Sequence, residues 1–92
     1  MDIYLPRIGP DAYPVFARLP GADLPEDFDR WSKRLDGWVL RHRTRGDNIH
    51  MIEMEVDEFS RWHRGMQTPP SLTSLRDFAQ IKASRQSDAL RR

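Results

Sequence analysis

The sequence predicts a single small α+β domain, and three observations carry that prediction. The chain has 92 residues, the length of one domain. Hydrophobic residues make up 38% of it and charged residues 32%, with a net charge of only +1, which is typical of a folded chain. Apolar residues recur with helical spacing in some segments and alternate in others. We expect a mainly antiparallel sheet of three or four strands, packed by two or three helices, within residues 1–84.

Proline dominates the first 25 residues. Proline fixes φ and lacks a backbone N–H, so a helix through this segment is not expected. Short strands are expected instead at residues 3–5 and 15–19. Pro14 and Pro20 suit the boundaries of the second strand. The prolines of the segment are Pro6, Pro10, Pro14, Pro20 and Pro25.

The first expected helix spans residues 25–36. Asp23 is placed to cap it, and Glu26 three residues later completes a pattern that resembles a capping box. Gly37 is expected to end the helix, because glycine is common just beyond a helix C-terminus. Apolar side chains follow one face at Phe28, Trp31 and Leu35.

A β-hairpin is expected at the centre of the sheet, with strands 38–45 and 49–56. Gly46, Asp47 and Asn48 between them all accept turn geometry. In this register Arg41 lies opposite Glu53, and opposite-charge pairs across strands contribute roughly 0.2–1 kcal/mol each. The other face of the hairpin carries apolar residues and is expected to face the core.

Two further helices complete the expected fold. The first spans residues 57–65, with Asp57 as its cap and Gly65 as its end. The second spans residues 72–84 and is capped by Ser71 or Thr73. The basic residues 85–92 contain few apolar side chains and are expected to form a frayed tail.

Several chemistries are improbable for this chain. It has no cysteine, which excludes disulfides, thiolate metal sites and a cysteine nucleophile. Its five glycines are isolated, and neither a phosphate loop nor a hydrolase motif is present. We therefore expect a non-enzymatic protein without a cofactor. The start of the chain does not resemble a signal peptide, and no apolar run approaches the roughly 20 residues of a membrane helix. The expected location is the cytoplasm, without membrane contact, and the excess of arginine over lysine suggests a bacterial GC-rich genome.

Histidines provide a weak candidate for metal or hydrolytic chemistry. His42 and His50 share one face of the expected hairpin, and neutral imidazoles are common metal ligands. No carboxylate shares that face, so a complete metal site is not expected. His63 is expected on the surface.

Binding is the remaining function class, in two forms. The first is contact with a protein partner or with a second copy through an N-terminal edge strand. Val39 and Met51 would contribute to it, because an exposed face mixing aliphatic side chains, methionine and arginine fits interface composition. The alternative is nucleic-acid binding by the β-ribbon and the basic C-terminal third, with the ribbon arginines Arg41, Arg43 and Arg45. The pI is about 8.2, below the value of about 9 typical of such domains, so the first form is favoured.

Overall fold

The computed structural model describes residues 1–90, with side chains through Arg85. Its elements in chain order are β1 (Asp2–Arg7), α1 (Tyr13–Ala17), α2 (Phe28–Thr44), β2 (Asn48–Glu53), α3 (Val56–Met66) and α4 (Leu72–Leu90). The expected α+β class is confirmed. Within residues 1–90 the sheet consists of two strands, and these are parallel. The prediction of a mainly antiparallel sheet of three or four strands was therefore wrong.

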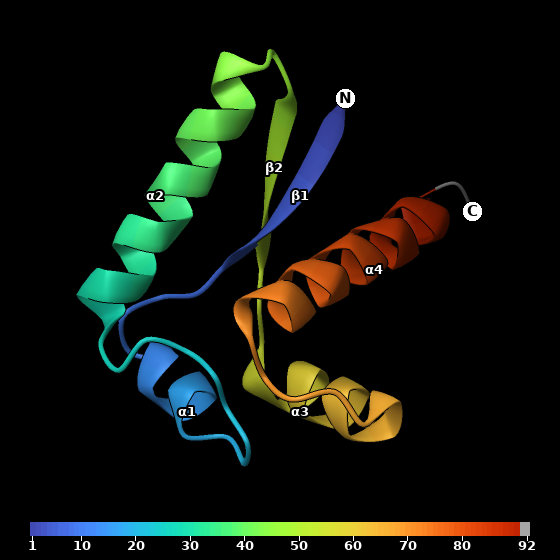
Figure 1. Ribbon diagram of the computed structural model, residues 1–92. Helices are drawn as coiled ribbons and strands as arrows, with labels where there is room; N and C mark the ends of the chain where they lie inside the picture. Colours follow the sequence, from blue (N-terminus) through green and yellow to red (C-terminus); the bar gives the residue numbers. More distant parts are fainter. Residues whose placement is uncertain (91–92) are drawn as a thin grey trace.

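The two strands pair over their full length. Their register runs from Asp2 opposite Asn48 to Arg7 opposite Glu53. Parallel strands cannot be joined by a tight turn and need a long crossover, which α1, α2 and their loops provide here. Figure 1 shows the strand pair running between α2 and α4, with α1 and α3 at the end where the strands finish.

The predicted hairpin does not exist, because residues 38–44 continue α2 and Arg45 is its C-cap. The alternation of three arginines suggested a strand, but arginine is also a good helix former. The apolar stripe that starts at Phe28 continues at helical spacing through Val39 to the buried His42. Gly37 does not end the helix, since a glycine inside a helix costs only about 1 kcal/mol relative to alanine. The N-cap is Asp27, whose carboxylate accepts a hydrogen bond from the backbone N–H of Arg30 at 2.8 Å.

The expected hairpin turn is instead the C-terminal end of α2. Gly46 has φ +81°, a left-handed conformation that glycine adopts readily. Its N–H donates to the carbonyl of Arg43 at 3.0 Å, and the N–H of Asp47 donates to the carbonyl of His42 at 3.0 Å. These two bonds form a Schellman motif, so the turn was located correctly but joins a helix to a strand.

A short helix replaces the strand expected at residues 15–19. Pro14 lies in the first turn of α1, where the missing N–H of proline costs no hydrogen bond. Tyr13 and Phe16, three residues apart, share the buried side of this turn. The expectation that proline excludes helix from this segment was therefore wrong for α1, because proline is tolerated in a first helical turn.

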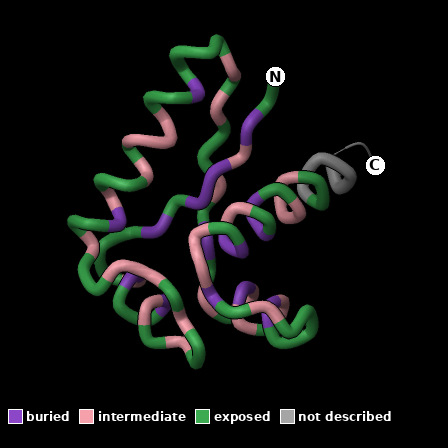
Figure 2. The backbone as a smooth tube through the Cα atoms, in the orientation of Figure 1, coloured by how far each residue is buried: buried purple, intermediate pink, exposed green. Residues whose placement is uncertain are grey.

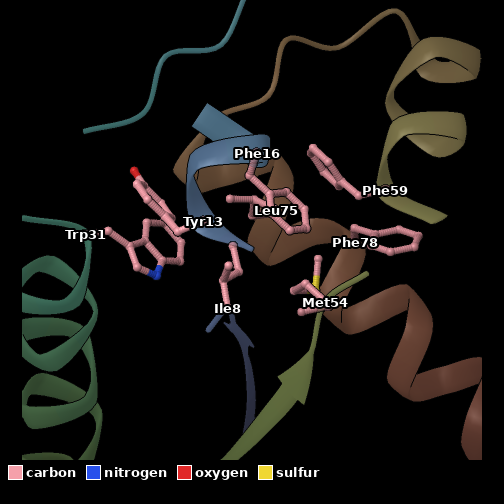
Figure 3. Close-up of a cluster of buried hydrophobic side chains, with 9 residues drawn as sticks. Ile8, Tyr13, Phe16, Trp31, Met54, Phe59, Leu75 and Phe78 are labelled. Carbon is pink, nitrogen blue, oxygen red and sulfur yellow. The ribbon is translucent and has the colours of Figure 1, made fainter. Parts of the chain in front are cut away.

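The core lies beyond the C-terminal ends of the two strands. Figure 3 shows it as a cluster built mainly from aromatic rings of α1, α2, α3 and α4. The ring centroids of Phe16 and Phe59 are 5.9 Å apart, those of Phe59 and Phe78 are 5.8 Å apart, and Tyr13 stacks on Trp31 at 5.5 Å. Such aromatic pairs add about 0.5–1.5 kcal/mol each to the burial of their surface. Ile8 and Met54, which follow the strands, connect the sheet to this cluster.

The last two helices confirm the predicted positions with changes at their ends. The N-cap of α3 is Glu55, not Asp57, and its side chain makes no capping bond. The helix passes Gly65 and ends at Met66, and its C-cap Gln67 has φ +52°. Ser71 rather than Thr73 caps α4, because its hydroxyl accepts the N–H of Ser74 at 3.2 Å. α4 continues to Leu90, and the last two residues of the predicted tail lie outside the described residues.

Burial differs sharply between the helices, as Figure 2 shows. In α2 only Trp31 and His42 are buried, so most of this 17-residue helix is open to solvent or half-buried. No helix in the described part of the chain combines the length and apolar character that a membrane crossing needs.

Candidate anion-binding site

The predicted binding residues occupy different surfaces of the molecule. In a helix, neighbours on one face are three or four positions apart. Arg41 and Arg45 therefore share a face of α2, while Arg43 lies on another face and Val39 is half-buried. Met51 is on β2 and 40% exposed. The cross-strand pairs predicted with Glu53 do not form, since Arg41 to Arg45 belong to a helix.

A line of arginines follows one face of α2, and we call it the basic stripe. Its members are spaced by four, seven and four residues, which keeps them on one side of an α-helix. At a rise of 1.5 Å per residue the stripe is about 22 Å long. Its residues are Arg30, Arg34, Arg41 and Arg45.

The charge of α2 contrasts with that of the whole chain. The helix and its C-cap Arg45 carry six basic side chains and two acidic ones, Asp29 and Asp36, whereas the net charge of the entire sequence is +1. Asp36 is six positions from Arg30 and five from Arg41, so it is not on the basic stripe. A positive surface of this kind on a nearly neutral molecule is an electrostatic footprint for an anion.

The C-terminal half of the basic stripe borders a small cavity that we call the arginine pocket. Its volume is about 180 Å³. A cavity of this size fits a compact group such as a phosphate, and it is smaller than the roughly 300 Å³ or more of sites for larger organic molecules. It is lined by Trp38, Arg41, His42, Arg45 and Arg76.

Arg76 joins the pocket from α4, which lies 31 residues beyond Arg45 in the chain. Its guanidinium carbon is 5.4 Å from the centre of the Trp38 ring. This cation–π contact holds the guanidinium against α2. The pocket therefore has walls from two separate elements, and three arginine residues line it.

These three guanidinium groups have no carboxylate partner in the part of the chain that the structure describes. The ion pairs of the described residues involve the N-terminus, Arg30, His42, His50 and Lys82. Arginine presents five N–H donors in a planar fork that matches the oxygens of phosphate or carboxylate. The pocket thus holds donors that only solvent or a bound anion can satisfy.

Asp47 lies two positions beyond Arg45, and its carboxylate is engaged elsewhere. Its Oδ2 lies 3.0 Å from Nδ1 of His42, and its Oδ1 lies 3.7 Å from the amino group of Met1. Both His42 and Asp47 side chains are largely buried, at 11% and 13% exposed. This pairing fixes the imidazole in the pocket wall and keeps the Asp47 carboxylate with other partners than the arginines.

The two candidate metal-binding histidines lie in separate pairs. His42 pairs with Asp47, while Nε2 of His50 lies 3.2 Å from Oδ1 of Asp2, and the His50 ring stacks on Tyr4 at 5.0 Å. The hydrogen bond with His50 is the main cause that lowers the pKa of the Asp2 carboxyl below 3.8. Among the described residues no three histidine, aspartate or glutamate side chains gather as a metal site.

Other residues differ from their expected roles. His63 is buried rather than exposed: it stacks on Phe59 at 5.4 Å, and its Nδ1 lies 3.1 Å from the carbonyl of Thr68. Lys82 of the basic C-terminal third contacts the carbonyl of Glu53 and the carboxylate of Glu58. Arg30, Arg34 and Trp38 were not expected in a site. Their spacing of four from Arg30 to Trp38 was the available signal, but it carries weight only once residues 38–45 are known to be helical.

The chain was compared with family models, curated proteins and solved structures. No family model, curated protein or solved structure matches this chain.

Proposed function

We propose that this protein binds nucleic acid by contacting backbone phosphates with the arginine pocket and the basic stripe. The observation that carries the proposal is the convergence of Arg41, Arg45 and Arg76 without a carboxylate partner among the described residues. The pocket has room for one phosphate, and the stripe continues for further charges along α2. Phosphate contacts of this kind supply most of the affinity in sequence-independent binding.

Nucleic-acid binding was the alternative function expected from the sequence, and we favour it here over a purely protein-binding role. The β-ribbon of that alternative is absent, but two of its three arginines and the basic C-terminal third, through Arg76, meet at one pocket. The expected location is the cytoplasm, where nucleic acid is accessible to the protein.

Titration of fluorescently labelled single-stranded and duplex oligonucleotides, followed by anisotropy, tests the proposal. We expect binding at about 50 mM salt that weakens steeply towards 200 mM, with log K falling by roughly 0.7–0.9 per phosphate contact per unit of log salt. Arg41→Gln and Arg76→Gln should each weaken binding and reduce that slope by about 1.

Arg43→Gln is the matched control, because it removes one positive charge from the same helix but from another face. We expect it to retain nearly wild-type affinity. Equal losses in Arg43→Gln and Arg41→Gln would show that net charge alone drives binding and would contradict the pocket. No binding to either oligonucleotide at low salt would overturn the proposal, and competition by inorganic phosphate alone would reassign the pocket to a small anion.

A further inference from the structure

The outer edge of β2 exposes backbone groups that no strand pairs within residues 1–90. At the two ends of the β1–β2 ladder, the N–H of Asn48 donates to the carbonyl of Met1 at 2.8 Å and the N–H of Met54 donates to the carbonyl of Arg7 at 3.0 Å. Both donors are at even-numbered positions. Because backbone groups alternate in direction along a strand, those of Ile49 and Met51 are directed away from β1.

The other edge of this small sheet is protected. On β1 the groups directed outward include Pro6, which has no N–H to donate and is fully buried. α4 packs closely along β1. On the outer edge of β2, one outward backbone group has a hydrogen-bond partner among the described residues: Nζ of Lys82 donates to the carbonyl of Glu53 at 2.7 Å. α2 and α4 also contact β2, but among the described residues no hydrogen bond engages the outward backbone groups of Ile49 and Met51. Edge groups without a partner are templates for strand addition.

We infer that this edge pairs antiparallel with β2 of a second copy of the chain. Charge complementarity indicates that the partner strand is β2 of a second copy and that it runs antiparallel. Glu53 and Glu55 lie at the end of β2, while Arg43 and Arg45 lie before its start. Asp47, between Arg45 and the strand, is paired with His42 and with the amino group of Met1. A two-fold axis across β2 places the acidic end of one copy beside the arginine end of the other, whereas a parallel arrangement brings like charges together.

The geometry of the edge fits such a dimer. Met51, near the middle of β2, is 40% exposed, and methionine adapts to irregular contacts. Pairing extends the two strands to a four-stranded sheet, and isolated two-stranded sheets are marginal in stability. The N-terminal strand β1 was the edge expected for self-association from the sequence, but Pro6 and α4 protect it, and β2 takes that role.

Met51→Pro is the sharpest test of this inference. Proline removes an N–H that the β1–β2 ladder does not use, so the fold is retained while the outer edge loses a donor. Met51→Ala is the matched control, because it shortens the side chain but keeps the backbone donor. Analytical ultracentrifugation over a dilution series up to about 0.5 mM detects dimers with a Kd of roughly 1 mM or tighter.

We expect the wild type and Met51→Ala to form dimers and Met51→Pro to remain monomeric, with circular dichroism confirming that each is folded. Glu55→Arg should weaken the dimer at least about tenfold, since it faces the arginine end of the partner. If Met51→Pro does not fold, Glu55→Arg alone decides the matter. A wild type that stays monomeric throughout the series, or a Met51→Pro dimer of unchanged strength, overturns the inference. Neither result depends on nucleic-acid binding, because no oligonucleotide is present.

Discussion

Tyr13 shows how one residue fastens two segments to the core. Its ring is completely buried against Trp31, and its hydroxyl donates to the carbonyl of Pro25 at 2.6 Å. Tyr13 begins α1 and Pro25 precedes α2, so this bond holds the loop between the two helices. A buried hydroxyl needs such a partner, because leaving it unpaired costs several times the net value of the bond.

Tyr13→Phe should lower the free energy of unfolding by about 1 kcal/mol, since it removes this hydrogen bond and retains the ring. Burial and the negative charge of Asp27 raise the pKa of Tyr13 above its usual value of 10, with Arg34 opposing them. The unfolded chain therefore ionises its tyrosine first, so this contribution is intact below pH 10 and declines as the pH rises above it.

Urea unfolding at pH 7 and at about pH 10.5 measures both effects. The wild type should lose more stability between the two pH values than Tyr13→Phe does. Equal losses in both proteins would show that the Tyr13 hydroxyl does not ionise differently in the folded state.

At the scale of elements, α2 shows what the sequence could predict and what it could not. The helix over its first apolar residues, the turn at Gly46 and the positions of α3 and α4 follow from helical spacing and glycine. The expected caps of α2 and α3, Asp23 and Asp57, were wrong. Its second half does not, because Trp38 to Arg45 satisfies a period of 2 and a period of 3.6 almost equally. Packing against the rest of the fold selects the helix over the strand in this segment. Tertiary contacts commonly override local propensity in this way.

The candidate site inherited that ambiguity. The sequence predicted Arg41 and Arg45 as binding residues, but it grouped them with Arg43, which only a strand places on the same face. Arg76 could not be assigned to the site, because its contact with Trp38 joins residues 38 positions apart. Long-range contacts of this kind carry no local pattern.

Gly37→Ala should stabilise the protein by about 0.5–1 kcal/mol. Gly37 lies inside α2, and an added Cβ would meet no atom within 4 Å, so the substitution restricts the unfolded chain without a clash. Gly46→Ala is the contrasting variant, since φ of +81° disfavours alanine and stability should fall by roughly 1 kcal/mol. Thermal unfolding of both variants provides the measurement, and opposite shifts in Tm are expected. A lower Tm for Gly37→Ala would contradict the assignment of this position to a helix interior.

At the scale of the whole molecule, the buried aromatic side chains are concentrated at one end. The aromatic cluster occupies the end where the strands finish, with Phe16, Phe59 and Phe78 at its centre (Figure 3). Towards the other end α2 contributes only one buried residue, His42, which is polar. The free energy of local opening should therefore differ along α2, because cooperative units open according to their buried apolar contacts.

Hydrogen exchange followed by NMR measures this difference residue by residue. We expect amides around Trp31 and in α4 near Phe78 to exchange only through global unfolding. Amides of α2 from Trp38 to Thr44 should exchange by local opening at a lower free energy. Uniform protection along the whole of α2 would show that the helix opens as one unit with the core.

The parallel pairing of β1 with β2 also has a consequence for synthesis. Each residue of β1 pairs with a residue 46 positions later in the chain, as Asp2 does with Asn48. At 5–20 residues per second, a nascent β1 waits roughly 2–9 s after its own translation before its partner strand is made. During that interval Ile3 and Leu5, both buried in the finished protein, have no sheet to join. β1 thus gains its partner strand only after α1 and α2 have been made, and its exposure during that delay is the period when a chaperone would matter most.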